Sequence, residues 1–288
     1  MPYELIITEK PDAAKKIAEA LADGKAIRKK DGTVSYYQAT HGSKDIVVAS
    51  AVGHLFTVAE ENKSFKYPVF DIVWKPSSEV NKKSAFSKKY ATVLKKLSKD
   101  ADSFTVACDY DIEGEVIGLN VIKYICKQKD ARRMKFSTLI KEDVQDAYAH
   151  ASPTIDWGQA NAGKTRHELD WLYGINLSRA LTLAIRKAGR FKILSAGRVQ
   201  GPALKIIVDK EKEIRAFVSE PYWQLLLHAS SHGAIIEAMH EKDKFTVKDE
   251  AQAVHDRCKG KPCVVGAVDR NEFSSPPPLP FNLGGLQT

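Results

Sequence analysis

The first half of the chain alternates short apolar runs with stretches of helical periodicity. Apolar, β-branched runs predict strands over residues 4–8, 46–52, 104–108 and 134–136. Apolar positions three and four apart predict helices over residues 11–21, 84–97, 115–125 and 141–148, and Pro11 suits the first position of its helix. This alternation is typical of an α/β domain with a mostly parallel sheet flanked by helices, to which we assign residues 1–152.

The pattern changes after a polar, proline-marked connection at residues 151–157. A helical period runs from Leu169 to Ile185 and again from Val199 to Ile214, so we expect a mainly helical module over residues 153–217. Beyond Pro221, residues 222–228, 234–239 and 262–268 have the pattern of strands around one helix near 250–258. We therefore expect a third, β-rich unit over residues 218–288.

Composition places the chain among ordinary globular proteins. Of its 288 residues, 43% are hydrophobic and 28% are charged, values near the average for folded domains. No apolar stretch approaches the roughly 18 residues that cross a bilayer, and charged residues within the first ten positions are unlike a signal or transit sequence. We expect a cytoplasmic protein that contacts no membrane. The four cysteines lack the CxxC spacing of a zinc site, so we expect free thiols.

The net charge of +8 is concentrated in one part of the chain. The segment from Lys164 to Lys205 carries nine basic residues and two acidic ones. A local surplus of this size favours a polyanionic partner, because clustered positive charge is the electrostatic footprint of nucleic-acid binding.

Three carboxylates follow an apolar run at alternate positions in the stretch VACDYDIEGE: Asp109, Asp111 and Glu113. If the extended conformation continues past Cys108, all three point to one side, at the edge where α/β sheets bind ligands. Crowded carboxylates repel one another unless a cation neutralises them, and hard oxygen ligands suit Mg²⁺. A solvated acidic loop before a helix remains the alternative.

Glu9 and Lys10 end the first predicted strand, immediately before Pro11 opens a helix. A carboxylate and an ammonium at that edge can perform acid/base chemistry and stabilise phosphate charge if they face the acidic triplet. Taken alone, the pair favours ordinary polar residues at a strand end over a catalytic role.

Residues 158–165 match the phosphate-binding pattern G-x-x-x-x-G-K-[ST]. A P-loop needs a buried strand before its first glycine, whereas residues 152–157 contain a proline and few apolar side chains. The hydrophobic run that ends at Asp109 also precedes the candidate loop, opposite to the usual order. We therefore do not favour nucleotide binding here.

The stretch LSAGRVQGPAL places a hydroxyl, a guanidinium and an amide just before an amphipathic helix: Ser195, Arg198 and Gln200. Such groups, with exposed backbone amides at Gly197, are suited to contact phosphate and sugar. An ordinary helix-cap loop is the alternative.

Together these motifs resemble the type IA DNA topoisomerases, particularly the archaeal topoisomerase and bacterial topoisomerase III branch. The motifs are EKP at 9–11, GHL at 53–55, DYDIEGE at 109–115, LDWLYGINLSRAL at 169–181, SAGRVQGPAL at 195–204 and PPPLPFNLGGLQ at 276–287. They occur in the family's order and cover nearly the whole chain.

The resemblance implies a Toprim domain over about the first 150 residues, with Glu9 and Lys10 as catalytic residues. It also implies an Mg²⁺ site made by Glu9, Asp109, Asp111 and Glu113. The helical module would line a groove for single-stranded DNA, with contacts from Arg166, Asp170, Ser195, Ala196, Gly197, Arg198, Val199 and Gln200. Residues after about 217 would begin the arch of a toroid.

Two features depart from the family pattern. Glu168 occupies a position, two before Asp170, where family members often carry a basic residue. The family's nucleophile is a tyrosine in a YPRT-like motif, and none of the ten tyrosines here has that context. We therefore expect a monomeric N-terminal portion of a longer topoisomerase, inactive alone in DNA relaxation. A Toprim nuclease or primase-like enzyme, and a P-loop ATPase, remain the alternatives.

Overall fold

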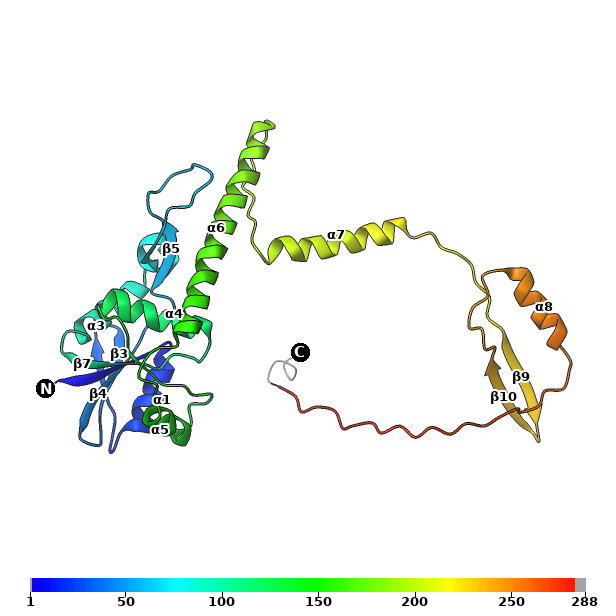
Figure 1. The fold of residues 1–288 in the computed structure, drawn as a ribbon, viewed down its shortest axis with the longest axis horizontal. Helices are drawn as coiled ribbons and strands as arrows, with labels where there is room; N and C mark the ends of the chain where they lie inside the picture. The colour runs from blue at the N-terminus through cyan, green and yellow to red at the C-terminus, as the bar shows by residue number, and fades with distance from the viewer. Residues whose placement is uncertain (1, 283–288) are drawn as a thin grey trace. The chain divides into compact units, whose positions relative to one another are not determined.

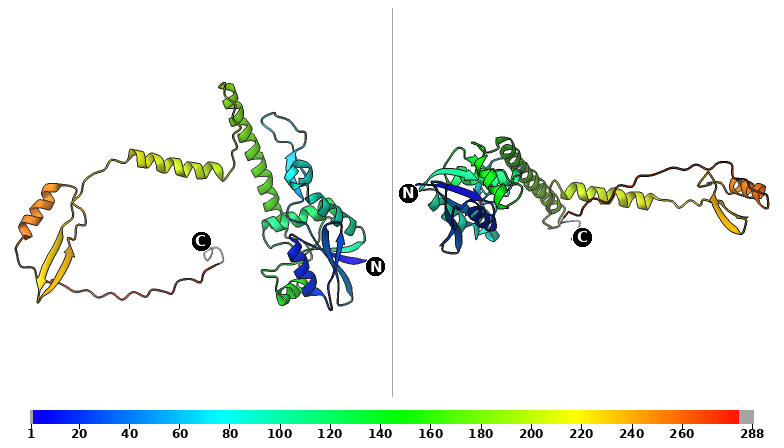
Figure 2. Two further views of the ribbon diagram at one scale, coloured as in Figure 1. Left: turned by 180° about the vertical axis from the view of Figure 1, so that it is seen from behind. Right: turned by 90° about the horizontal axis from the view of Figure 1, so that it is seen from below.

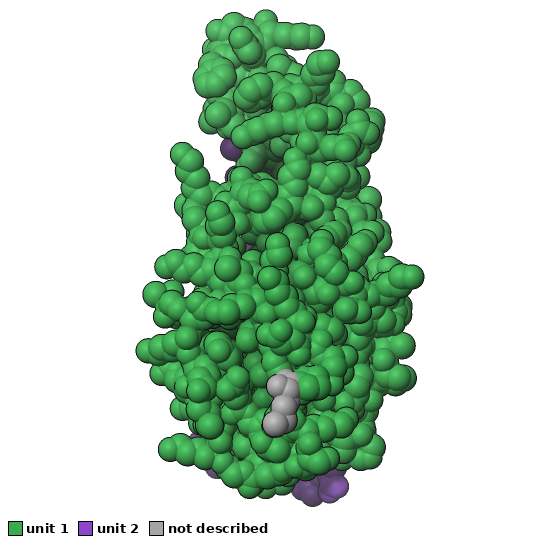
Figure 3. All heavy atoms as spheres, turned by 90° about the vertical axis from the view of Figure 1, so that its left-hand side faces the viewer, with its two compact units in different colours: residues 1–209 green, residues 210–288 purple. Residues whose placement is uncertain are grey.

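The computed structural model describes residues 2–282, and the chain forms two compact units, residues 1–209 and 210–288 (Figure 3). The division into three domains that the sequence suggests stays a prediction. Each unit is described here by itself.

A six-stranded sheet in the order β2-β3-β4-β1-β7-β8 forms the centre of the first unit (Figure 1). Its strands are β1 (Tyr3–Thr8), β2 (Ile27–Asp31), β3 (Val34–His41), β4 (Lys44–Ser50), β7 (Ala101–Val106) and β8 (Arg132–Arg133). Strand β1 pairs in parallel with β4 and β7, β8 pairs in parallel with β7, and β2, β3 and β4 form an antiparallel meander. The expected α/β class with a mainly parallel centre is confirmed.

Helices cover both faces of this sheet (Figure 1, Figure 2). They are α1 (Pro11–Leu21) and α5 (Lys141–Ala149) on one face, and on the other α3 (Ser87–Leu97) and α4 (Ile112–Asn120), which continues as a π-helical turn (Val121–Ile125). In β1, Leu5 and Ile7 join the buried cluster with α3 and α4, whereas Ile6 joins the cluster with α1 and α5. Both sides of the strand are thus buried, which explains its uninterrupted apolar sequence.

A separate hairpin of β5 (Phe56–Glu60) and β6 (Ile72–Pro76) lies beside α6 (Trp157–Lys187), and two short helices, α2 (Ser77–Val80) and η1 (Lys82–Ser84), follow it. Arg179 of α6 donates two hydrogen bonds, of 2.9 and 2.7 Å, to the carboxylate of Glu60. These hydrogen bonds hold the pKa of Glu60 below its ordinary value. The side-chain oxygen of Asn176 accepts a bond of 2.7 Å from the backbone of Val69, so α6 fixes this hairpin at two points.

Within the second unit, β9 (Leu226–Ser231) and β10 (Ala234–Met239) form an antiparallel hairpin next in sequence to α8 (Lys248–Cys258). Helix α7 (Gln200–Ala216) spans the boundary between the units in sequence. His232 and Gly233, with φ of 50° and 82°, make the two-residue turn of the hairpin. No helix among the described residues has the length and apolar character needed to span a membrane.

Several sequence expectations differ from the structure. The strand expected at residues 262–268 is wrong: residues 259–282 contain no helix or strand, and Val264 is 91% exposed. A strand there would need a neighbour to pair its backbone, and the described residues supply none. The strand expected at 134–136 is displaced to β8, two residues earlier.

The P-loop alternative, which the sequence did not favour, is excluded, because residues 158–165 lie inside helix α6 and form no loop. Gly163 is buried, and a Cβ built on it would lie 2.5 Å from both the carbonyl oxygen of Ile112 and Cγ2 of Val116. This glycine therefore allows α6 to approach α4 closely, which is a packing role and not a phosphate-binding one.

Replacing Gly163 by alanine should lower the free energy of unfolding by about 1–3 kcal/mol, because the added methyl group forces the two helices apart. Gly174→Ala is the matched control in the same helix, since its nearest contact would be an ordinary 3.5 Å. Denaturant unfolding of both variants measures their free energies of unfolding. Equal stability of the two variants would contradict the packing role.

Candidate active site

Glu9 and Lys10 lie at the carboxyl end of β1, where the chain turns into α1. The backbone carbonyl of Glu9 accepts a hydrogen bond of 3.1 Å from Gly53, so the loop after β4 lies against this strand end. The Lys10 ammonium lies 2.9 Å from Oδ2 of Asp109 and 3.5 Å from Oε1 of Glu9. The chemistry expected from the sequence requires Glu9 and Lys10 to face the acidic triplet, and the contact between Lys10 and Asp109 meets this requirement.

Two of these groups have shifted pKa values. Burial first, and the charge of Asp109 second, raise the pKa of Glu9 above that of an ordinary carboxyl. The hydrogen bond to Asp109, followed by the charge of Glu9, raises the pKa of Lys10. Glu9 thus keeps its proton to higher pH, whereas Lys10 stays an ammonium.

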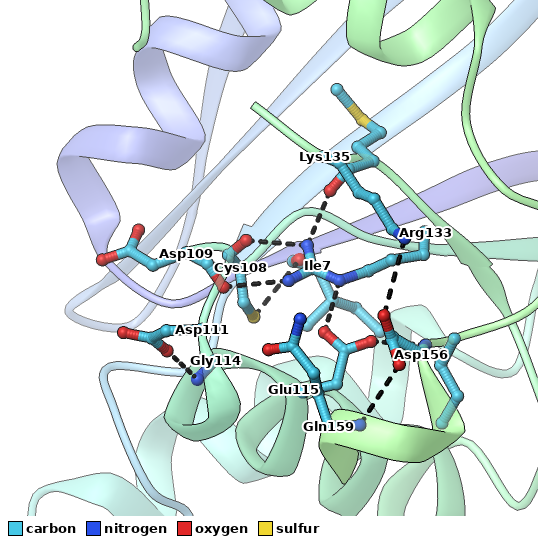
Figure 4. A network of polar contacts seen from close by, with 12 residues as sticks. Ile7, Cys108, Asp109, Asp111, Gly114, Glu115, Arg133, Lys135, Asp156 and Gln159 are labelled. Atoms are coloured by element: carbon cyan, nitrogen blue, oxygen red, sulfur yellow. Dashed lines mark hydrogen bonds and ion pairs between the residues drawn. The ribbon is translucent and has the colours of Figure 1, made fainter. Parts of the chain in front are cut away.

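The acidic triplet does not continue the strand as the alternation predicted. Strand β7 ends at Val106, and Asp111 is the N-cap of α4, its Oδ1 accepting a bond of 2.7 Å from the backbone of Gly114. Glu113 therefore lies on the first helical turn. A Cβ at position 114 would lie 2.1 Å from the carbonyl oxygen of Asp109, so this tight turn requires glycine. The carboxylates of Asp109 and Asp111 point to the same side in Figure 4.

A fully buried ion pair lies behind this loop (Figure 4). Arg133 of β8 and Glu115 of α4 both have fully buried side chains, and Nε of Arg133 lies 2.5 Å from Oε2 of Glu115. The same guanidinium donates to the carbonyls of Cys108 at 2.8 Å and Asp109 at 2.9 Å. Oε1 of Glu115 accepts a bond of 2.6 Å from the backbone of Asp156, the N-cap of α6.

Glu113 faces two histidines, His54 in the loop after β4 and His167 on α6. Oε2 of Glu113 lies 3.1 Å from Nε2 of His54 and 2.7 Å from Nε2 of His167. Burial first, and the neighbouring His167 second, lower the pKa of His54. Sequence reasoning gave no role to either histidine, although the GHL motif contains His54 and His167 directly follows Arg166.

The expected DNA-contacting side chains of the helical module come together in part. Arg166 lies 3.4 Å from Oε1 of Glu113 and 3.9 Å from Oδ2 of Asp170, and Arg198 donates to Oδ1 of Asp170. These charged groups therefore form a chain that ends at the acidic loop. Glu168, the departure from the family pattern, accepts a bond of 3.0 Å from the indole of Trp74.

The other residues expected to contact DNA lie near the start of α7. An irregular stretch before the helix holds Ser195, Ala196, Gly197 and Val199, and Gln200 is the first residue of the helix. The backbone of Ala196 donates to Ser178 Oγ at 2.9 Å, which attaches the loop to α6. Val199 is 81% exposed and so is open to a partner.

All four cysteines are free thiols, with Cys108 and Cys126 buried and Cys258 and Cys263 exposed. Burial raises the pKa of the Cys108 thiol, which keeps it protonated and unreactive beside the acidic loop.

The fold and its acidic strand ends define a Toprim protein: residues 4–139 match the model of the Toprim domain, and residues 154–288 match that of the DNA topoisomerase family. The chain is 47% identical to DNA topoisomerase 1 of Pyrococcus furiosus and 48% identical to that of Methanocaldococcus jannaschii, in each case over 98% of its own length. The chain therefore belongs to the type IA DNA topoisomerases.

The chain spans 27% and 37% of the length of these two relatives. A solved structure of full-length topoisomerase I from Thermotoga maritima matches with a TM-score of 0.57 and 22% identity, covering 87% of this chain and 37% of that one. At this identity the likeness concerns the fold alone.

Arg133→Met should lower the free energy of unfolding by about 3–5 kcal/mol, because it leaves Glu115 as an unpaired charge in the core. The double variant Arg133→Met with Glu115→Leu should be more stable than the single one, since it buries no charge. Lys96→Ala removes only an exposed pair with Asp31 and should leave the unfolding midpoint unchanged. Chemical denaturation measures all three, and a stable single variant would contradict this role of the pair.

Proposed function

We propose that residues 1–288 are the metal-binding and DNA-binding part of a type IA topoisomerase, which cleaves and rejoins single-stranded DNA by transesterification. The observation that carries the proposal is the contact of the Lys10 ammonium with Asp109 and Glu9, 2.9 and 3.5 Å away, at the carboxyl edge of two adjacent parallel strands. Ligands bind α/β sheets at this edge, and phosphoryl transfer needs positive charge and acid/base groups there.

The donor set fits Mg²⁺. Glu9, Asp109 and Asp111 offer carboxylate oxygens around one strand edge, and Asp111 uses only Oδ1 for its cap. Mg²⁺ usually takes one or two carboxylates and keeps several waters or phosphate oxygens, so an open acidic edge suffices. Charge supports the assignment, since burial first and the charge of Asp109 second raise the pKa of Glu9, and a cation would relieve the repulsion between the two carboxylates. We assign Glu9, Asp109, Asp111 and Glu113 as the residues that would hold the ion, which would neutralise phosphate charge when bound.

In the reaction we propose, a tyrosine oxygen loses its proton to water and bonds to a backbone phosphorus, while the bond from phosphorus to a deoxyribose oxygen breaks. Glu9 gives a proton from one carboxyl oxygen to the departing oxygen, a role suited to a carboxyl with a raised pKa, and would face the ion with its other oxygen. Lys10 stabilises the charge on the phosphate. Resealing runs the same steps in reverse, because the phosphotyrosine bond retains the energy of the broken one.

The strand would lie along the helical module. Four basic side chains of the helical module have no ion-pair partner among the described residues: Arg186, Lys187, Arg190 and Lys192. Uncompensated positive charge of this kind favours a phosphate backbone. Arg166, Asp170 and Arg198 would position the strand next to the acidic loop, together with the exposed stretch from Ser195 to Gln200.

No tyrosine of this sequence has a YPRT-like context, so we propose that residues 1–288 supply no nucleophile and do not relax DNA alone. The competing proposal is a Toprim nuclease, in which water attacks the phosphate. Metal-dependent nicking by this chain itself would favour that competitor.

Replacing Asp109 and Asp111 together by asparagine should abolish Mg²⁺ binding, because it removes two of the four proposed carboxylate ligands. The helix should survive, since asparagine caps as well as aspartate. The charge-matched control is Asp100→Asn with Asp102→Asn, two exposed carboxylates at the opposite end of β7. Titration calorimetry with Mg²⁺ compares the two double variants, and equal affinity would place the ion elsewhere.

Single-stranded DNA should bind the chain with an affinity that falls steeply between about 50 and 200 mM salt, since bound phosphates release counterions. Arg198→Ala should weaken binding and reduce the logarithmic salt slope by about 0.7, the value of one phosphate contact. Arg28→Ala, at an exposed arginine of β2, is the control. A flat salt response, or equal slopes for the two variants, would contradict the DNA assignment.

A further inference from the structure

The two histidines that flank Glu113 form, with it, a compact group of potential metal ligands that shares only Glu113 with the proposed magnesium site. The ligand atoms of His54, Glu113 and His167 all lie within 4.8 Å of one another, and this is the single group of its kind within residues 2–282. Three different elements supply them: the loop after β4, the first turn of α4, and α6.

Two of the three separations between ligand atoms are close to those in a tetrahedral site. Zinc bonds to imidazole nitrogen and carboxylate oxygen at about 2.0–2.2 Å, so its ligand atoms lie a little over 3 Å apart. The observed separations from Glu113 Oε2 are 3.1 Å to His54 and 2.7 Å to His167, so an ion between them requires only a small opening. The three side chains are each about one-third exposed, at 31, 35 and 31%, which leaves access for the ion and for a water as fourth ligand.

Neighbouring residues hold the loop of His54 and pack against the ring of His167. Ser77 donates a hydrogen bond of 2.9 Å to the carbonyl of His54, which holds the loop that carries it. The rings of His54 and His167 meet edge to face at 4.9 Å, and Trp74 packs against His167 at 5.7 Å. A site whose ligands are already oriented loses less entropy when it binds an ion.

The ligand types separate this group from a magnesium site. Imidazole suits zinc and other first-row transition ions, whereas Mg²⁺ prefers oxygen and dehydrates reluctantly. Glu113 belongs to both sets: its Oε2 faces the histidines and its Oε1 lies 3.4 Å from Arg166.

We propose that His54, Glu113 and His167 bind a divalent transition ion such as Zn²⁺, and that this ion withdraws Glu113 from the magnesium site. The second half of the proposal rests on the proposed function, whereas the first half stands without it. Zinc then acts as an antagonist of Mg²⁺ through one shared carboxylate.

The test is a binding titration of the full chain with Zn²⁺, and with Co²⁺ as a spectroscopic probe, in a background where Cys258 and Cys263 are serine. This background removes the two exposed thiols that would also bind these ions. The variants are His54→Asn, His167→Asn, Glu113→Gln and the double variant Asp109→Asn with Asp111→Asn. His150→Asn is the matched control, because His150 also pairs with a carboxylate, Asp146 at 3.0 Å, but belongs to no group of three ligands among the described residues.

We expect one equivalent of Co²⁺ with the absorption of a four-coordinate ion, and a loss of affinity of at least about tenfold in each histidine variant. The control and the aspartate double variant should keep Zn²⁺ binding. Mg²⁺ binding should survive in the histidine variants, and Glu113→Gln should weaken both ions.

Unchanged Zn²⁺ affinity in His167→Asn, or no saturable Co²⁺ binding, would overturn the site. Zn²⁺ and Mg²⁺ binding together, without mutual displacement, would overturn the antagonism. The aspartate double variant tests the proposed function separately. If it loses Mg²⁺ binding but keeps Zn²⁺ binding, both sites are supported; if it keeps Mg²⁺ binding, the magnesium site fails while the zinc site stands.

Discussion

The buried pair between Arg133 and Glu115 orders the part of the molecule on which its chemistry depends. Its guanidinium holds the carbonyls of Cys108 and Asp109, which fixes the backbone from which Asp109 and Asp111 project. Its carboxylate accepts the backbone amide that begins α6. One fully desolvated pair thus joins the sheet edge, the acidic turn and the long helix, although burial of two charges contributes little net stability by itself. We interpret its role as fixing position.

The arrangement gives the acidic turn two different surroundings. On the strand side, Asp109 meets Glu9 and Lys10, a set of oxygen ligands and one ammonium suited to a phosphate and a hard cation. On the helix side, Glu113 meets two imidazoles and Arg166. The one-turn separation of Asp109 from Glu113 follows from Asp111 acting as the cap of α4. Helix capping therefore places Glu113 beside the histidines while Asp109 stays beside Glu9 and Lys10.

The sequence predicts the central elements well where local chemistry and burial agree. Helix α1 begins at Pro11 and ends at Leu21 as expected, and the apolar runs of β1 and β4 are recognisable because both of their faces are buried. Strand β2 could not be predicted in this way: its sequence, IRKKD, is almost entirely exposed, and its pairing with β3 makes it a strand. The glycine-lysine pattern at residues 158–165 misleads for the converse reason, since it reflects helix packing at Gly163.

The sequence predicts part of the candidate site, but neither its two histidines nor the way its residues group together. Motif and strand-end position identify Glu9, Lys10 and the acidic triplet. The orientation of Glu113 towards His54 and His167 depends on contacts between residues 54 and 59 positions apart in sequence, which no local pattern reveals.

The account is tested most directly in a longer protein that joins these residues to the family's tyrosine segment. Incubated with single-stranded DNA and Mg²⁺, that protein should form a covalent protein–DNA adduct, whereas residues 1–288 alone should form none and should not relax supercoiled DNA. Glu9→Ala in the longer protein should slow adduct formation at least about a hundredfold, the usual effect of losing an acid/base group. Adduct formation at an undiminished rate in that variant, or relaxation by residues 1–288 alone, would contradict the account.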